Sequence, residues 1–299
     1  MKKGTIIWTA VLLTLAGGGT LQWGWTTWLR STGQVPPTKA EQALARAKAG
    51  QALWEEKCRT VVGEKIYKVV PDVEGVVLLK LRPQASSREW ADPNWPGAAF
   101  ARENMGDGYI KTFLGYEAAF AFGGVPRPIT KEYRGSINTS DKLGPKKYPG
   151  YRYVDVIDAQ DGQHYRYSGS VKVVGRKDTT AKGVQMALAR DPNYDLNIYS
   201  WTLDRIPAPD PAPRYGVTFE DHVIPEERAL GVASSTVRVI DLETGEVLGE
   251  MLRYAWSTPA NSANPSPWLT AHRCPDHAVG TDAATRKFVD QVLIPRKEH

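Results

Sequence analysis

The chain has 299 residues and a formal net charge of +5, with 41% hydrophobic and 24% charged residues. These values are typical of a folded globular protein, and they exclude a disordered chain, a collagen and a disulfide-dense mini-protein. The 21 prolines and 27 glycines, beside 10 tryptophans and 13 tyrosines, favour short strands and irregular loops over a helical bundle.

The first 30 residues have the pattern of an export signal. Lys2 and Lys3 precede residues 5–29, which contain no charged side chain. Two interpretations stay open. Residues 6–16 are the apolar region of a signal peptide cleaved near the glycines at 17–19, or the whole segment is retained as an anchor, because about 20 apolar residues suffice to span a bilayer.

Three tryptophans favour the retained anchor. Trp23, Trp25 and Trp28 crowd the far end of the segment, where indole rings settle at the level of the lipid headgroups. Lys2 and Lys3 then orient the N-terminus towards the cytoplasm. The sequence therefore predicts a single-pass inner-membrane protein, held in the inner membrane by residues 5–29, with its C-terminal domain in the periplasm.

Cys58 and Cys274 are the only cysteines of the chain. An even pair in an oxidising compartment predicts one disulfide, while two unpaired buried thiols remain the alternative. The bridge would tie the start of the globular domain to its end, and the chain-entropy model gives such a long loop about 5 kcal/mol of stabilisation.

The chain divides into four predicted parts. Residues 1–30 are the signal-anchor, 31–37 a linker, 38–63 an amphipathic stalk helix, and 64–299 a β-rich periplasmic domain. Thr38 is a good N-cap for the helix, Glu41 stands at the capping-box position, and Gly63 can close the far end.

Beyond the helix, strands are expected at 65–70, 75–81 and 196–203, the second of them central because it is apolar on both faces. Two hairpins are expected at 151–167 and 236–256, with turns at 158–162 and 241–245, where Asp bonds the turn backbone and Gly supplies a positive φ. A loop is expected at 83–105, apolar segments of undetermined type at 109–113 and 116–122, an exposed basic loop at 126–150, and a closing helix at 282–293. The predicted fold class is α+β.

The sequence contains no nucleophile elbow, no zinc-protease motif, no phosphate-binding loop and no dinucleotide fingerprint. Its densest cluster of reactive residue types contains His272, Cys274 and His277. These three side chains are weak candidate ligands of a metal, or Cys274 and His277 a nucleophile and its base. The alternative, which the compartment favours, is a disulfide cysteine flanked by two surface histidines.

Two further sets of residues are candidates for an enzyme that acts on glycans. Acid and base groups could come from the acidic residues around His222, namely Glu220, Asp221, Glu226 and Glu227. A sugar could stack on the tryptophans at 90, 95, 201, 256 and 268. The expected alternatives are solvated charge in a loop between strands for the acidic residues and core packing for most of the tryptophans. The modest positive charge without a basic stripe argues against nucleic-acid binding, and no cofactor is expected.

Several stretches spread over most of the chain after residue 50 carry a resemblance, namely residues 56–59, 72–76, 106–110, 214–218, 266–269, 274–275 and 285–289. They resemble a group of proteobacterial envelope proteins with an N-terminal membrane segment. The resemblance implies a member of that group and brings no catalytic residue. Some proteins of this kind resemble immunity or accessory proteins that accompany secreted toxins.

The sequence thus predicts a membrane-tethered periplasmic protein that binds a protein partner, such as a toxin or an envelope complex, without catalysis. The alternative is an envelope hydrolase acting on a glycan or an ester. An enzyme would have a pocket with convergent groups of shifted pKa, whereas a binding module would present an exposed surface.

Overall fold

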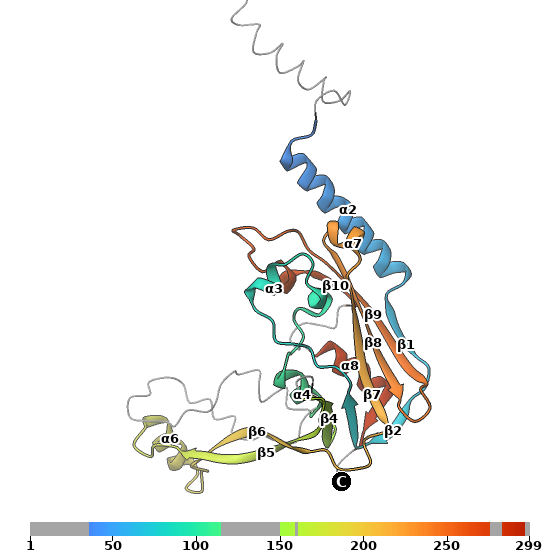
Figure 1. Ribbon diagram of the computed structural model, residues 1–299. Coiled ribbons are helices and arrows are strands. Elements are labelled where there is room, and N and C mark those ends of the chain that lie inside the picture. The colour runs from blue at the N-terminus through green and yellow to red at the C-terminus, as the bar shows by residue number, and fades with distance from the viewer. Residues whose placement is uncertain (1–35, 115–149, 159–160, 276–282, 297–299) are drawn as a thin grey trace, which may run out of the picture. The chain divides into compact units, whose positions relative to one another are not determined.

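The computed structural model describes residues 36–114, 150–158, 161–275 and 283–296 (Figure 1). The described residues from Leu53 onward form one compact unit, and those up to Ala52 belong to another. Within the described ranges, no helix is both long and apolar enough to cross a membrane. The predicted anchor at residues 5–29 with its three tryptophans, the segments at 116–122 and 126–149, and His277 lie outside these ranges.

A mixed nine-stranded sheet is the centre of the larger unit. The strand order is β1-β9-β8-β7-β3-β4-β5-β6, and β10 also pairs with β9. Strand β3 runs parallel to both of its neighbours, and the other pairs in this sheet are antiparallel. The bounds are β1 Gly63–Ile66, β3 Gly75–Leu78, β4 Tyr153–Ile157, β5 His164–Arg176, β6 Asn197–Pro207, β7 Tyr215–His222, β8 Val232–Asp241, β9 Val247–Trp256 and β10 His272–Cys274.

A second, two-stranded sheet and a set of helices complete the described chain. Strand β2, Val70–Val73, pairs in parallel with β11, Leu293–Pro295. The helices are α2 Lys39–Thr60, α3 Ser87–Ala91, α4 Asp107–Phe113, α6 Lys182–Arg190, α7 Pro225–Ala229 and α8 Ala284–Val292, with 3₁₀ turns η1 Pro96–Phe100 and η2 Pro267–Thr270. The β-rich α/β character of the predicted fold is confirmed.

The predicted local signals are largely confirmed. Thr38 and Glu41 form the capping box of α2, in which each side chain accepts a hydrogen bond from the backbone N–H of the other. The two hairpins form as β4–β5 and β8–β9, and the glycines that close their turns, Gly162 and Gly245, have φ values of +68° and +75°. The closing helix is α8, and its apolar side is buried.

Four predictions were wrong. The strand expected at 65–70 does not form as one element, because β1 ends at Ile66 and β2, which belongs to the other sheet, begins at Val70. The segment 83–105 contains α3 and η1, since Ser86 and Glu89 form a capping box that starts a helix. The acidic residues Glu220 and Asp221 lie on strand β7, not in a loop. Gly63 is the first residue of β1, and α2 ends three residues before it.

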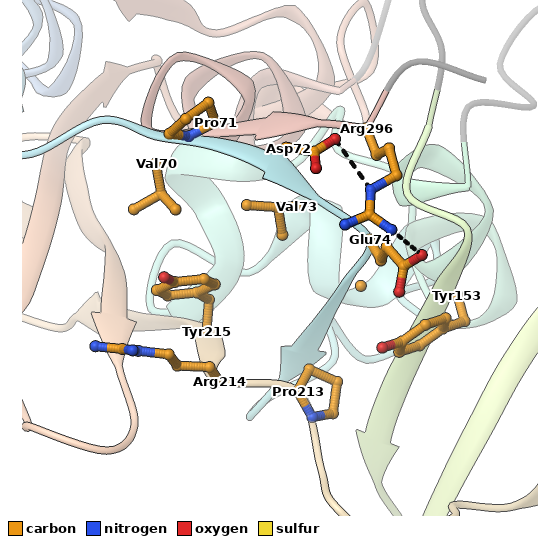
Figure 2. A pocket seen from close by; sticks show the side chains of 11 residues that line it. Val70, Pro71, Asp72, Val73, Glu74, Tyr153, Pro213, Arg214, Tyr215 and Arg296 are labelled. Atoms are coloured by element: carbon orange, nitrogen blue, oxygen red, sulfur yellow. Dashed lines mark hydrogen bonds and ion pairs between the residues drawn. The ribbon is translucent and has the colours of Figure 1, made fainter. Parts of the chain in front are cut away.

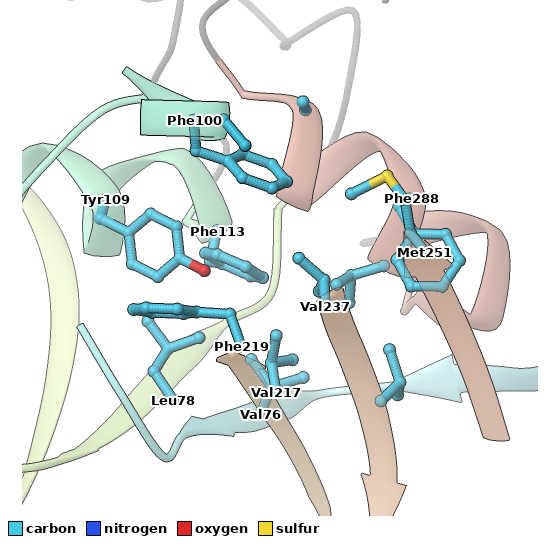
Figure 3. Packing of buried hydrophobic residues seen from close by; sticks show 14 of the residues in the cluster. Val76, Leu78, Phe100, Tyr109, Phe113, Val217, Phe219, Val237, Met251 and Phe288 are labelled. Atoms are coloured by element: carbon cyan, nitrogen blue, oxygen red, sulfur yellow. The ribbon is translucent and has the colours of Figure 1, made fainter. Parts of the chain in front are cut away.

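The core lies on one face of the sheet, beneath η1, α4 and α8. Figure 3 shows Val217, Phe219, Val237 and Met251 of β7, β8 and β9 pointing towards rings on these helices, including Phe288 of α8. Arg286 of α8 joins the helices to each other, because its buried guanidinium donates to the backbone carbonyls of Thr112 and Phe113 at the end of α4. Carbonyls in the last turn of a helix lack the regular i+4 amide partner.

The pair β5–β6 extends beyond the rest of the sheet. Strand β4 pairs with β5 only over residues 164–167, whereas β5 and β6 stay paired as far as Arg176 and Asn197. The two strands therefore continue as a ribbon towards α6 (Figure 1). Strand β6 ends the strand order, and in the described part of the chain no strand pairs with its outer edge.

The predicted disulfide between Cys58 and Cys274 is present. It joins the last turns of α2 to β10, and β10 pairs with β9. Beside it, Trp54 of α2 stacks on Trp256 of β9, with ring centroids 6.5 Å apart. The bond closes a loop that spans nearly the whole larger unit, with a sequence separation of 216.

Replacing both cysteines by serine is expected to lower the free energy of unfolding by about 2 to 5 kcal/mol, because the unfolded chain gains the freedom that the long loop closure removes. Urea unfolding of both proteins, with and without reductant, measures this loss. Reductant should destabilise the wild-type chain and leave the double variant unchanged. Alkylation of both cysteines in the unreduced wild-type protein would contradict the bond.

Candidate functional site

The predicted cluster around Cys274 is a structural element. Cys274 is disulfide-bonded to Cys58, so its sulfur is not available as a thiolate for metal binding or nucleophilic attack. His272 stacks on Trp256 at 5.3 Å between ring centroids and contacts Trp54 at 5.7 Å. Among the described residues, no group of three or more metal-binding side chains comes together. The position therefore anchors α2 to the sheet.

The acidic pair Glu220–Asp221 is divided between the two faces of the sheet, because consecutive side chains of a strand alternate. Glu220 faces outward and pairs with Arg238 at 3.2 Å. Asp221 faces inward, towards the helices. His222 faces outward and contacts the Thr236 hydroxyl at 2.9 Å. These residues do not converge on one site.

Asp221 belongs to a row of polar side chains across three strands. In the strand register it stands opposite Ser235 of β8, which stands opposite Arg253 of β9. Ser235 donates a hydrogen bond of 2.6 Å to Asp221, and Arg82 forms an ion pair with the same carboxylate at 3.2 Å. Arg82 and Arg253 are buried. A charged layer therefore separates the sheet from the segments above it.

Aromatic rings complete the desolvation of these arginines. The Arg82 guanidinium lies between Phe219 and Phe100, 4.0 and 4.1 Å from their ring centroids, and Arg253 lies 4.8 Å from the Phe100 ring. Rings and guanidinium groups thus alternate from β7 up to η1. Such contacts strengthen when water is excluded, so the stack fixes η1 on the sheet.

Glu103 lies next to this layer and is only 5% exposed. Its Oε2 accepts hydrogen bonds from the backbone N–H and the hydroxyl of Thr285 in α8, at 3.3 and 3.2 Å. Burial raises its pKa to about 7, although Arg82, Arg253 and the Thr285 hydrogen bonds each lower it. Carboxyl groups whose pKa lies near 7 are common in functional sites.

Two hollows are candidates for a binding pocket. The first, of about 280 Å³, lies between β2, β4 and the start of β7 (Figure 2). Its charged residues already have protein partners: Arg296 pairs with Asp72 and Glu74, and Arg214 pairs with Asp241 at 2.6 Å. A ligand would have to replace these pairs.

The second hollow, which we call the Trp90 pocket, has a volume of about 450 Å³. It lies over the charged layer, between the end of α3, the turn after η1 and the start of η2. Its lining includes Gln84, Trp90, Glu103, Asn104, Met105 and Leu269. Trp90 Nε1 and Glu103 Oε1 are buried, and neither has a hydrogen-bond partner in the described part of the chain. The raised pKa of Glu103 marks this pocket as the stronger candidate.

The remaining predicted tryptophans divide between packing and the pocket. Trp95 and Trp268 are buried in the core. The Trp268 indole N–H donates a hydrogen bond of 2.7 Å to the backbone carbonyl of Asp92. Trp256 packs near the disulfide, and the side chain of Trp201 is outside the described residues. Only Trp90 lines the pocket.

No sequence pattern indicated a role for Glu103, because 83–105 was expected to be a loop, or for Arg82, which lies just before that segment. One local signal was available. The capping pattern at Ser86 and Glu89 predicts α3, which delivers Trp90 to the pocket. The pairing of Arg82 with Asp221 joins residues 139 positions apart, and no local pattern predicts it.

Comparison of the chain with protein-family models, with curated proteins and with solved structures gave no match. The resemblance to envelope proteins stays a prediction, and the interpretation of the site depends on its geometry.

Replacing Arg82 by methionine is expected to lower the free energy of unfolding by about 3 to 5 kcal/mol, because it leaves the Asp221 carboxylate buried without its cation. Arg296→Met is the matched control. Its partners Asp72 and Glu74 are far more exposed, and exposed ion pairs contribute about 1 kcal/mol or less. Equal losses in urea unfolding of the two variants would contradict the role of the charged layer.

The stability of Glu103→Gln should differ from that of the wild type in a pH-dependent way. The pKa of Glu103 rises from 4.5 to about 7 on folding, so the stabilising contribution of its protonated form is present below pH 4.5 and disappears as the pH rises to 7. The free energy of unfolding of the variant should therefore rise by about 3 kcal/mol relative to that of the wild type between pH 4.5 and 7.

Glu89→Gln supplies the control of opposite sign. The hydrogen bond from the Ser86 hydroxyl lowers the pKa of Glu89, so the stability that ionised Glu89 contributes is lost as the pH falls. Denaturant titrations at several pH values measure both differences. A difference between Glu103→Gln and the wild type that stays flat from pH 4.5 to 7 would show that Glu103 ionises normally in the fold.

Proposed function

We propose that the chain is a non-catalytic binding protein of the cell envelope, tethered to the inner membrane by residues 5–29, with its folded part in the periplasm. The observation that carries this proposal is the outer edge of β6, which has no strand partner in the described part of the chain. The occupant we propose for this edge is an extended segment of a partner protein.

The length of β6 supports this occupant. It has 11 residues, whereas β1, at the other end of the strand order, has four. Long unpaired edges bind other strands through their free N–H and C=O groups, and proteins usually shorten them or protect them with lysine or proline. In β6 the charged residues are Asp204 and Arg205 and the one proline is Pro207, so residues 197–203 contain neither a charge nor a proline.

Exposed apolar side chains lie on the same ribbon. Ile206 of β6 and Val173 of β5 are each 55% exposed, and Met186 of α6 is 51% exposed. A strand added to β6 would gain backbone hydrogen bonds from the edge and apolar contacts from these side chains. This combination favours a protein that binds another protein. The role that we propose first is that of an immunity or accessory protein for a secreted toxin.

A hydrolase acting on a glycan or an ester is the second candidate, and Glu103 is the observation that favours it. A carboxyl with a pKa near 7 is suited to general acid catalysis. Glycoside hydrolysis, however, uses two carboxyl groups on either side of the bond. Among the described residues, Glu103 is the only acidic one that lines the Trp90 pocket. Binding without catalysis therefore stays the first proposal.

A photo-crosslinking amino acid placed at Asp204 or Ile206 should join the chain to one partner protein in living cells. These positions lie two residues apart on one face of β6. If the partner pairs as a strand, mass spectrometry should find the two crosslinks about two residues apart in one partner segment. Crosslinks scattered over unrelated sites would contradict strand pairing.

Val69 is the matched control position, since it is 49% exposed and lies just before β2, away from β6. It should give no such adduct. Removal of residues 1–35 should abolish the adduct if the partner is met in the envelope. An adduct composed of two copies of this chain would replace the proposed partner by a homodimer.

A further inference from the structure

The outer edge of β6 has a fixed hydrogen-bonding pattern. At one end of the β5–β6 pair, the N–H of Ala208 donates to the carbonyl of His164, and at the other end the N–H of Lys177 donates to the carbonyl of Leu196. Hydrogen-bonded and non-hydrogen-bonded residues alternate along an antiparallel pair, so the even-numbered residues of β6 bond to β5. The odd-numbered residues 199–205 therefore direct their N–H and C=O groups to the edge that no strand occupies in the described part of the chain.

The β5–β6 ribbon has one apolar and one polar face over residues 168–173 and 199–204. Consecutive positions of a strand alternate between the two faces, and positions opposite each other share a face. One face contains the pairs Gly169–Leu203, Val171–Trp201 and Val173–Tyr199, and the other contains Ser168–Asp204, Ser170–Thr202 and Lys172–Ser200. Such a difference between faces is typical of an antiparallel sheet that packs on a core with one face only.

The apolar face continues the core face of the main sheet. Tyr167 of β5 stands opposite Val154 of β4, which is fully buried. Tyr167 and Leu203 are partly buried and pack against the core cluster. Val173, further along the same face, is 55% exposed. In the described part of the chain, the cover of this face therefore decreases from Leu203 towards Val173.

The apolar stretch of the edge is limited at both ends. Arg205, the next odd position, has its guanidinium 3.5 Å from the Tyr165 ring centroid and pairs with Asp158 at 2.9 Å. Ile198 belongs to the opposite face and is only 6% exposed. Residues 199–203 between these ends contain no charge. Cross-strand pairs with them are most favourable when apolar residues stand opposite the apolar positions and uncharged polar residues stand opposite the hydroxyl positions.

An antiparallel strand added to this edge is defined in both its pattern and its hydrogen bonds. Its residues opposite positions 199, 201 and 203 would form the hydrogen-bonded pairs, with their side chains on the apolar face. Antiparallel pairs are slightly more stable than parallel ones and more common.

We propose, resting on the proposed function, that the partner segment pairs antiparallel with β6 and is itself two-faced. Apolar residues occupy the alternate positions whose N–H groups bond to residues 199–203, and uncharged polar residues stand between them. The segment thereby extends the core face of this protein by one strand.

A synthetic peptide with the sequence Lys-Thr-Val-Thr-Val-Thr-Val-Thr-Lys and an N-terminal fluorophore tests the pattern. Fluorescence anisotropy with the full-length protein in detergent should show saturable binding. A peptide of the same composition with its three valines adjacent should bind about tenfold more weakly, because most of its apolar cross-strand pairs are lost. No saturable binding of the alternating peptide, or equal binding of both peptides, would overturn the proposal.

N-methylation of the alternating peptide tests the hydrogen bonds. Methyl groups on the valine nitrogens should abolish binding, because these N–H groups bond to β6. Methyl groups on the two threonines between the valines should leave binding nearly unchanged, since their N–H groups point away from β6. The reverse result, or an equal loss from both modifications, would overturn the proposed pairing.

Leu203→Thr is the diagnostic variant of the protein, because threonine suits a strand but removes apolar contact from the edge. It should weaken binding of the alternating peptide several-fold, whereas Asp204→Asn, at a position on the polar face, should leave it unchanged. An equal loss in both variants, with thermal unfolding that shows folded proteins, would overturn the assignment to the apolar face. The peptide comparisons use the wild-type chain and do not depend on the folding of a variant.

The partner crosslinked in cells at Asp204 and Ile206 separates this inference from the proposed function. Its crosslinked segment should alternate between apolar and uncharged polar residues. A segment that pairs as a strand without this alternation would overturn the inference and leave the proposed function in place. Absence of any adduct in cells would overturn the proposed function, even where the peptide binds as expected.

Discussion

The alternation of rings and guanidinium groups from Phe219 through Arg82 and Phe100 to Arg253 determines how the connection after β3 lies on the sheet. An arginine in an apolar core is tolerated only with its charge compensated and its faces covered. Asp221 supplies the charge, and the phenylalanine rings supply the cover. Because Phe100 belongs to η1, the position of η1 is set by the electrostatics of the layer as much as by apolar burial.

The same layer explains why Glu103 is an unusual carboxyl. Burial of Glu103 favours its neutral form and raises its pKa, whereas Arg82 and Arg253 favour the ionised form and lower it. Burial prevails because the arginines are already engaged with Asp221 and with the rings. Asp221 and Glu103 are thus two carboxyl groups in neighbouring environments, the first firmly ion-paired and the second with a pKa near 7. Only the second lines a pocket.

The sequence predicts the elements with local signals and fails where distant contacts decide. Thr38 and Glu41 specify the start of α2, and Gly162 and Gly245 specify the hairpin turns, because each acts through its own backbone geometry. The disulfide follows from the count of cysteines. The Trp90 pocket could not be predicted, since it is built from α3, the turn after η1 and η2, which approach each other only across the folded sheet.

The β6 edge and the Trp90 pocket lie on parts of the sheet that are joined by few contacts. The pocket covers the region of β7, β8 and β9, and the route from there to β6 passes through β3. Strand β3 has four residues and pairs with β7 at only two positions, Val77 with Gly216 and Leu78 with Val217. Coupling between sites needs an element whose alternative arrangements both sites bias. A short, fully buried strand held in parallel on both sides offers no second arrangement, so occupation of one site should leave the affinity of the other unchanged.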